Sequence, residues 1–519
     1  MSYIVEQKIN GRIYLYKVDS YWDKTKKQAR QKRTYIGPKN KKNKSKIKQK
    51  YSSIIHKNYG NIFLVENIAK RIGVKHILQT VFPNAYNDIL ALAYYDIMEG
   101  SPLYLFPYWH DEQYLINNRK LHSSAISNIC EELGLSQVQR LDFICKWIEH
   151  LKPINGVYYD ITSISSYSSN IDFIEWGYNR DKENLAQLNY GVTFCQKNLL
   201  PIYYNVYPGS IVDVKTLKNC IEYLKVYNLS DILFILDRGF FSKANVLKMD
   251  ENINKVHFIQ PLPFTLTKVK SLLRINKYKL KNSSNSFKFN DQILHYKLST
   301  LEFDDKTFDA HIFYDEKSEV DQKHSFLNIL FELEEKLKLS KKKILTLKEY
   351  LKYRESNIPK KYCMFFKWNK KKQCIEKNIK TIKVHISKMG SFILLTNNKD
   401  LDKIKVLEYY RQRDRVEKVF DIVKNEFDTD RIRAHSQYNT DGRLFIKFIS
   451  LIIYMEISRV MKEKELFKRY SVKELLSELK KLKITKIEEG SLLVSELSKS
   501  QRKIFEAFGI KEDEIEHSY

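Results

Sequence analysis

Hydrophobic residues recur at helical spacing through the first part of the chain and change to strand-like runs after it. Between residues 61 and 151, apolar side chains are separated by three or four positions, as at Ile126, Ile129 and Leu133. This is the period of an amphipathic helix, so the pattern predicts an all-α region. Two adjacent helices around Gly134 are compatible with a helix-turn-helix, but we favour simple helix packing.

Three runs rich in β-branched and aromatic residues follow, and then come a helical pattern and one continuous apolar run. They occupy residues 157–162, 190–195, 201–207, 212–227 and 232–237. The predicted order is therefore β-β-β-α-β. Three hairpin-connected strands followed by a helical crossover form the opening of a ribonuclease-H-like sheet, although periodicity alone also allows other α/β folds.

The next segment, residues 263–390, mixes strand-like runs with lysine-rich turns, and we expect it to be an inserted, mainly β domain. Its expected strands are 287–296, 308–314 and 382–386, and its expected helix is 323–339. A strand at 391–396, a long helix at 401–425, an apolar helix at 444–461 and small terminal helices are expected after it.

Composition places the chain among globular proteins, and its charge makes a polyanion the first partner to consider; net charge alone does not distinguish DNA from RNA or from an anionic membrane. Of 519 residues, 43% are hydrophobic, while 15 Gly and 10 Pro are too few for a collagen-like or disordered protein. The formal net charge is +28, and residues 1–60 contribute half of it, with 17 Lys and Arg against 3 Asp and Glu. Residues 3–16 and 33–37 alternate like strands, and Pro38 opens a lysine-rich tail. That tail is either a solvated linker or a DNA-contacting arm.

The six cysteines are scattered without a C-x-x-C pair, which argues against a zinc ribbon and against a disulfide framework. The N-terminus lacks the pattern of a signal peptide, and the most apolar stretch, residues 445–455, is 11 residues long and contains Lys447. We expect a cytoplasmic protein without a membrane span, associated with the nucleoid when it is bound to DNA.

Two acidic residues stand where strands deliver side chains to one end of a sheet. Asp160 lies within the first strand, and Asp237 ends the apolar run. Ligands of α/β sheets bind at the carboxyl ends of strands, and two neighbouring carboxylates repel unless a divalent cation lies between them. Such a pair favours Mg²⁺ or Mn²⁺. Taken alone, either residue is also compatible with a simple strand end or turn.

A third group of candidates lies on the long helix at 401–425. At 100° per residue, Tyr410, Arg413, Glu417 and Lys424 fall within one stripe of about 60°, beside an apolar flank that can dock on the sheet. An acid between bases on one face is also typical of a solvated helix with i,i+4 pairs.

Together, Asp160, Asp237 and the Y-x2-R-x3-E-x6-K spacing resemble the DDE transposases of bacterial insertion sequences, specifically the insertion-sequence-four-like group with a Y-R-E-K signature. Residues 237–240, Asp-Arg-Gly-Phe, match the motif of the second carboxylate without change. Residues 176–181 and 208–213 are similar to two further motifs, from which Asn179 and Ser210 depart. The departures affect substrate positioning and leave the metal ligands undisturbed.

The resemblance implies a ribonuclease-H-like catalytic domain at 152–262 and 391–465, interrupted by the insertion at 263–390. A basic β and arm region at 1–60, an α-helical DNA-binding region at 61–151 and a helical region at 466–519 flank it.

The resemblance also implies roles for individual residues. Asp160, Asp237 and Glu417 would be the catalytic acids and would hold two Mg²⁺ or Mn²⁺ ions. The expected DNA-binding residues are Tyr410, Arg413, Lys424, Arg238 and Trp176. Trp176 is a conceivable stacking residue for a flipped base, although we favour a buried indole. His435 is expected to contact the DNA backbone or to lead into a helix rather than act as a general base.

The function implied is metal-dependent cleavage at the inverted-repeat ends of an insertion sequence, followed by strand transfer into target DNA. Both substrates are double-stranded DNA, and synapsis of two ends favours a homodimer. Two alternatives stay open: a catalytically silent DNA-binding regulator and a ribonuclease-H-like nuclease. The presence of all three acids disfavours a silent regulator, and the Y-R-E-K helix disfavours a general ribonuclease-H-like nuclease.

Overall fold

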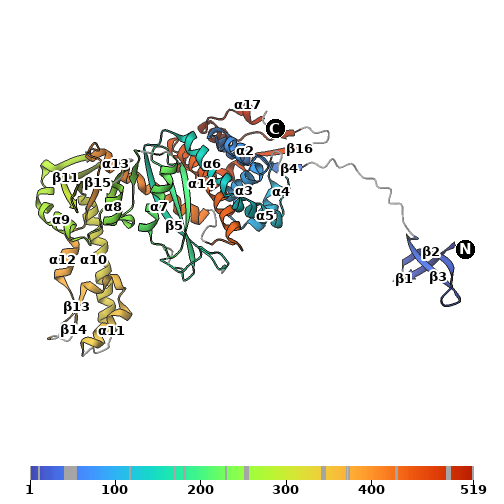
Figure 1. The fold of residues 1–519 in the computed structure, drawn as a ribbon, viewed down its shortest axis with the longest axis horizontal. Coiled ribbons are helices and arrows are strands. Elements are labelled where there is room, and N and C mark those ends of the chain that lie inside the picture. Colours follow the sequence, from blue (N-terminus) through green and yellow to red (C-terminus); the bar gives the residue numbers. More distant parts are fainter. Residues whose placement is uncertain are drawn as a thin grey trace.

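A computed structural model gives the fold (Figure 1). It describes residues 2–9, 12–39, 55–115, 119–168, 170–178, 183–227, 229, 231–250, 256–339, 346–369, 371, 374–426, 431–486 and 492–516. The basic N-terminal residues form an antiparallel sheet of β1 (Ser2–Ile9), β2 (Arg12–Asp23) and β3 (Gln28–Pro38), which confirms the strands predicted there. The lysine-rich tail at 40–54 lies outside the described residues.

The largest sheet within the described ranges has nine strands in the order β10-β11-β12-β15-β9-β8-β5-β6-β7. Its centre consists of β5 (Gly156–Ser165), β6 (Gln187–Cys195) and β7 (Pro201–Pro208), which are antiparallel neighbours. On the other side of β5, β8 (Leu233–Ile235) and β9 (His257–Pro261) continue the sheet in parallel. With α7 (Asp213–Val226) as the crossover before β8, the predicted β-β-β-α-β order is confirmed.

Helices cover both faces of this sheet. Tyr158 points to one face, where its hydroxyl donates to the Tyr409 carbonyl of α13 (Lys403–Glu426) at 3.1 Å. The neighbouring Tyr159 points to the opposite face, where it meets Tyr207, whose hydroxyl donates to the Thr216 carbonyl of α7 at 3.3 Å. Because both faces are covered, β5 and β6 are buried along nearly their whole length.

Helices also surround α14 (Gln437–Glu463) and confirm the all-α region. They are α1 (Gly60–Arg71), α2 (Val74–Val81), α3 (Tyr86–Met98), α4 (Phe106–Glu112), α5 (Ser123–Leu135) and α6 (Gln137–Leu151). In α5, Ser127 accepts a hydrogen bond on its carbonyl from the Asn439 side chain of α14 at 3.0 Å. A Cβ added at Gly134 or Gly442 would lie 1.9 Å from a backbone oxygen of the other helix. This close contact supports simple packing of α5 rather than a free recognition helix.

The C-terminal segment packs on the start of the helical region. It contains α15 (Val472–Leu479), α16 (Lys499–Ala507) and α17 (Glu512–Glu516), as expected, and also two strands that were not predicted. β16 (Lys483–Lys486) pairs with β17 (Leu492–Val494) and with β4 (Ile55–Asn58), so residues more than 400 positions apart share a small sheet. None of the described helices is long and apolar enough to cross a membrane.

The expectation that residues 263–390 are mainly β is wrong. Strands β10 (Ser286–Phe289), β11 (Gln292–Phe303) and β12 (Lys306–Tyr314) join the large sheet through β15 (Ser391–Thr396), but helices make up much of the segment. These are α9 (Thr267–Leu280), α10 (Glu316–Leu339), α11 (Leu347–Asn357) and α12 (Ile379–Ile386). At 24 residues, α10 is twice as long as β11, the longest of these strands, with 12.

The run at 382–386, predicted as a strand, belongs to α12. Ile382 and Ile386 are four residues apart and therefore lie on one helical face, and the side chain of Asn378 caps the helix by accepting from the Thr381 amide at 3.3 Å. A short β-branched run does not distinguish a strand from one turn of a helix.

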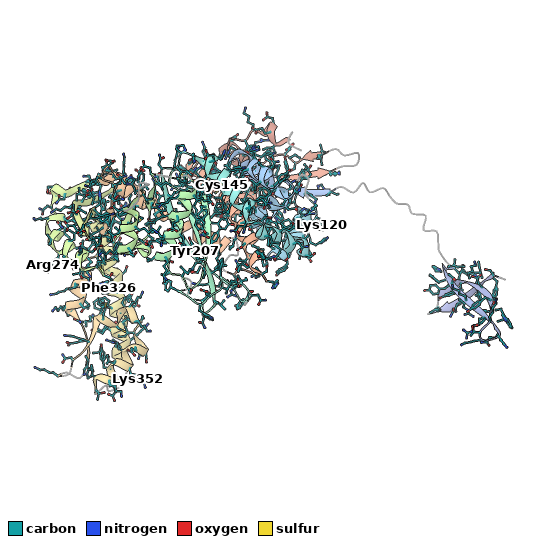
Figure 2. All side chains as sticks on the ribbon, viewed as in Figure 1. Lys120, Cys145, Tyr207, Arg274, Phe326 and Lys352 are labelled. Carbon is teal, nitrogen blue, oxygen red and sulfur yellow. The ribbon has the colours of Figure 1, made fainter. Side chains whose placement is uncertain are left out.

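Part of the segment forms an arm with its own small core. In Figure 1, α10 leads away from the sheet to α11, β13 (Phe366–Asn369) and β14 (Cys374–Lys377). Helix α12 lies beside α10, at the end of the arm that is nearer the sheet. Figure 2 labels Phe326 within this arm and Lys352 at its far end. Phe326, Leu330, Phe365 and Ile382 are buried together in a cluster separate from the main core.

We expect Gly442→Ala to destabilise the protein by about 1–3 kcal/mol, because the added methyl group would collide with the Cys130 carbonyl and push α5 away from α14. Asn128→Ala is the matched control, since Asn128 is exposed on α5. Thermal unfolding followed by circular dichroism measures both. An unchanged midpoint for Gly442→Ala would show that the two helices do not pack this closely.

Candidate functional site

Two carboxylates lie at the same level on neighbouring parallel strands. The last paired residues of β5 and β8 are Tyr158 and Ile235. Asp160 lies two positions after Tyr158, and Asp237 lies two positions after Ile235. Asp237 keeps an extended backbone beyond β8. Strands lie about 4.8 Å apart, and residues two positions apart point to the same face. The register therefore brings both predicted acids to one place on one face of the sheet.

The backbone around both acids is held by the sheet. The Ile161 amide donates to Asp160 Oδ1 at 2.8 Å, and the Asp160 side chain is half-buried. The Asp237 backbone carbonyl accepts a hydrogen bond from the side-chain Nε2 of Gln260, on β9, at 2.8 Å. These bonds hold the Asp160 carboxylate and the backbone of Asp237 in place.

Helix α13 is attached to β5 at the same face. The Tyr158 hydroxyl lies 3.1 Å from Gln412 Oε1, in addition to its bond with the Tyr409 carbonyl. Gln196, which follows β6, donates from Nε2 to Gln412 Oε1 at 3.2 Å. Gln412 therefore connects the helix to two segments of the sheet.

One residue later, α13 reaches the second acid. The Arg413 Nη1 atom lies 3.5 Å from Asp237 Oδ1, and Arg413 is buried. Its guanidinium carbon is 5.6 Å from the ring centroid of Tyr410. The tertiary structure thus brings together Asp160, Asp237 and the turn of α13 that carries Tyr410 and Arg413, three parts of the chain that lie far apart in the sequence.

Tyr410 stays protonated in this environment. Burial raises the pKa of its hydroxyl, and the charges of Arg413 and Arg238 act in the opposite direction. Arg238 is exposed, and its guanidinium carbon lies 5.6 Å from the Phe264 ring centroid. A neutral phenol and two guanidinium groups beside Asp237 can donate hydrogen bonds to an anionic ligand.

Glu417 lies on α13 one turn beyond Arg413, about 6 Å farther along the helix axis. Lys424 lies two turns beyond Glu417 on the same helix. The side chains of both lie outside the described residues. Within the described part of the chain, no group of three or more His, Cys, Asp or Glu side chains is arranged to hold a metal ion.

Sequence reasoning missed Asp213 as a site residue. A Cβ added at Gly239 would lie 3.5 Å from Asp213 Oδ2 and 3.7 Å from Asp237 Oδ2, so both carboxylates face the space above this glycine. Asp213 stands in the first turn of α7. The sequence contained a signal for Asp213, because this residue ends the Gly-Ser-x-x-Asp motif at residues 209–213.

The favoured prediction that the Trp176 indole is buried is wrong, because Trp176 is 66% exposed. Its segment contacts the loop after β7, where the Ser210 hydroxyl donates to Glu175. A Cβ added at Gly177 would lie 1.9 Å from the Gly209 carbonyl oxygen, so the backbones touch and leave the indole outside. Asn179 lies outside the described residues.

His435 is exposed directly before α14. The next residue, Ser436, caps this helix by accepting a hydrogen bond from the Asn439 amide at 3.0 Å. The expectation that His435 leads into a helix is therefore confirmed.

Comparison with known proteins identifies the domain that contains this site. The family described as "Transposase DDE domain" matches residues 152–453, more than half of the chain. No curated protein matches the sequence. Among solved structures, the chain is similar to a piggyBac transposase synaptic complex with hairpin DNA determined by cryo-electron microscopy. The identity is 12%, the TM-score is 0.33, and the match covers 80% of this chain and 70% of that one.

We expect Tyr158→Phe to destabilise the attachment of α13 to β5 by about 1–2 kcal/mol, because the Tyr409 carbonyl loses its hydroxyl donor. Hydrogen exchange of the α13 amides should become faster, and the unfolding midpoint should fall. Tyr108→Phe is the matched control, since Tyr108 is 74% exposed. Unchanged exchange in α13 would contradict this role of Tyr158.

Proposed function

Since the chain belongs to the transposase DDE domain family, we propose that it is a metal-dependent DNA transposase that cuts at the inverted-repeat ends of an insertion sequence and joins them to target DNA. The observation that carries the proposal is the parallel register that aligns Asp160 with Asp237, together with the Arg413 side chain that α13 extends to Asp237.

The strand order supports a ribonuclease-H-like catalytic domain. Three antiparallel strands, β7, β6 and β5, are followed by the parallel strands β8 and β9, and α7 is the crossover. This is the topology that the β-β-β-α-β pattern predicts. The segment at 263–390 then interrupts this domain before α13 returns to it.

The donor set fits a divalent cation. Asp160 and Asp237 offer carboxylate oxygens at one level of the sheet, and Gly239 leaves the space beside Asp237 free of a Cβ. Hard cations such as Mg²⁺ and Mn²⁺ take oxygen ligands. We assign Asp160, Asp237 and Glu417 as the ligands of two such ions. When bound, the ions would activate water or a DNA 3′-hydroxyl and stabilise the leaving oxygen of the phosphodiester.

The residues of α13 would position the DNA strand. Arg413 lies beside Asp237 with Tyr410 next to it, so both can donate hydrogen bonds to a phosphate, and Lys424 continues the same stripe of the helix. A phosphate near the carboxylates needs such donors, because charge accumulates on its oxygens during the displacement. This arrangement supports assigning the chain to the group of transposases that carries the Y-R-E-K signature.

The proposed partner is double-stranded DNA at the element ends and at the target. The net charge of +28 suits a polyanion. Arg238 and Trp176 are exposed, so both are available for contacts with the DNA, Trp176 by stacking on a base. Because two ends must be cut and joined together, a homodimer in the synaptic complex is part of the proposal.

We expect Glu417→Gln and Asp160→Asn to reduce Mg²⁺-dependent nicking of a labelled duplex that carries the element end by at least about a hundredfold. Binding of the same duplex in a mobility-shift assay should remain, because neither change removes a basic residue. Glu408→Gln is the matched control, since Glu408 is exposed on the same helix.

Each other outcome favours a different function. If the wild-type protein binds the ends but does not cut them whichever divalent ion is supplied, it is a silent regulator. Nicking of any duplex without preference for the ends indicates a general nuclease. Full activity in Glu417→Gln would remove Glu417 from the ligand set.

We expect Gly239→Ala to leave the stability within about 0.5 kcal/mol of the wild type, because the new methyl group would be in ordinary van der Waals contact at 3.5 Å and 3.7 Å. The methyl group occupies the space between Asp213 and Asp237, so Mn²⁺ affinity measured by calorimetry should fall about tenfold. Unchanged Mn²⁺ affinity would show that the ion does not use this space.

A further inference from the structure

The N-terminal sheet of β1, β2 and β3 has two faces of different composition. Paired residues share a face and successive residues alternate, so the register assigns every side chain to one face. The hydrogen bonds, ion pairs and ring contacts of its described side chains all stay within the sheet. One face, which we call the aromatic face, carries Tyr3, Tyr16, Trp22, Gln31, Arg33 and Tyr35.

The aromatic face is organised around Val18, which is fully buried. Next to Val18, the rings of Tyr16 and Tyr35 meet with their centroids 5.5 Å apart, and Gln31 Nε2 donates to the Tyr3 hydroxyl at 2.8 Å. Tyr3 and Tyr35 nevertheless remain 48% and 54% exposed. Exposed aromatic side chains gathered on one face mark an interaction surface.

No acid of the sheet lies on the aromatic face. Residues 2–9 and 12–39 contain ten Lys and Arg against three Asp and Glu, a formal charge of +7. By the register, all three acids belong to the opposite face, and each is ion-paired with a different basic residue. The pairs are Glu6 with Lys39, Asp19 with Lys17 and Asp23 with Arg30. The acids are therefore already matched, and seven positive charges remain in excess.

This excess is concentrated in the β2–β3 turn and in β3. Residues 24–39 contain seven Lys and Arg and no acid. In the turn, Asp23 Oδ1 accepts the amides of Thr25 and Lys26 at 3.0 Å and 3.1 Å, which holds exposed lysines at the tip of the hairpin. Beyond the turn, β3 is an edge strand with exposed side chains at nearly every position. A surface of this charge is complementary to a polyanion.

Among polyanions, duplex DNA offers a groove of matching size. Its major groove is about 12 Å wide and admits a two-stranded β-ribbon, whose strands lie about 4.8 Å apart. The major groove of duplex RNA is too narrow for side chains to read. On β3, Gln31 and Arg33 lie on the aromatic face about 6.8 Å apart, which is two base steps of about 3.4 Å. Arg pairs with guanine and Gln with adenine at their major-groove edges.

We propose that the aromatic face of this sheet lies in the major groove of the element-end duplex and reads its bases through Arg33 and Gln31. The lysines of the β2–β3 turn contact the flanking phosphates, and Tyr35 and Trp22 contact apolar base edges such as the thymine methyl group. The assignment rests on the proposed transposase function and adds to it the segment that recognises the element end.

The test compares two neighbouring residues of β3 in the full chain, in the Asp160→Asn background so that no DNA is cut. Arg33 and Lys32 are both exposed, but they lie on opposite faces, and only Arg33 is on the aromatic face. Arg33→Gln should lower the affinity for the element-end duplex about tenfold more than the affinity for an unrelated duplex of equal length. Lys32→Gln, the matched control, removes the same charge and should lower both affinities by the same factor.

End duplexes in which one guanine at a time is replaced by 7-deazaguanine locate the contact, because this base lacks the N7 acceptor of the major groove. One position should weaken binding of the Asp160→Asn protein but not of the same protein with Arg33→Gln. An identical pattern in both proteins, or Arg33→Gln binding both duplexes like Lys32→Gln, overturns the proposal. A loss confined to single-stranded DNA of the same sequence assigns the face to a single strand and also overturns it.

Failure of the proposed function gives a different result. A wild-type protein that never nicks the element end refutes the transposase activity, whereas the 7-deazaguanine contact is read from binding alone. Wild-type nicking at the end, together with equal end preference in Arg33→Gln and Lys32→Gln, refutes only the base-reading role of the sheet.

Discussion

The parallel pairing of β5 with β8 is the constraint on which the rest of this structure depends. It sets Asp160 and Asp237 at one level of the sheet, although they are 77 positions apart in the sequence. Two carboxylates this close repel each other, so the sheet must hold them against that repulsion. The burial of β5 and β8 and the cover of α7 on one face and α13 on the other supply the stability for it.

Helix α13 depends on the same strand for its own position. Tyr158 and Gln412 attach it to β5, and this attachment brings the buried Arg413 to Asp237. The segment that leads into α14 depends on β5 as well, because the backbone of Ile432 is bonded to Ser165 at the end of the strand. One strand therefore positions the acids, α13 and the segment that leads into α14.

Local pattern was sufficient for most elements of the central sheet. The runs at 157–237 predicted three strands, a helix and a fourth strand in the observed order, because such segments bury continuous apolar surface whatever their partners. The spacing of Tyr410 and Arg413 likewise predicted a common helical face. Pattern failed where a short run fits two structures, as at 382–386, or where burial depends on another segment, as for Trp176.

By itself, the sequence determined the basic character of the protein and the order of the elements from β5 to β8 along the chain, and it predicted Asp160 and Asp237 as candidate acids, because charge and periodicity are properties of neighbouring residues. Only the tertiary structure decided that β16 pairs with β4 and that Asp213 faces the space above Gly239. These features arise from contacts between residues far apart in the chain. Such contacts are selected by the packing of whole elements, which no local pattern encodes.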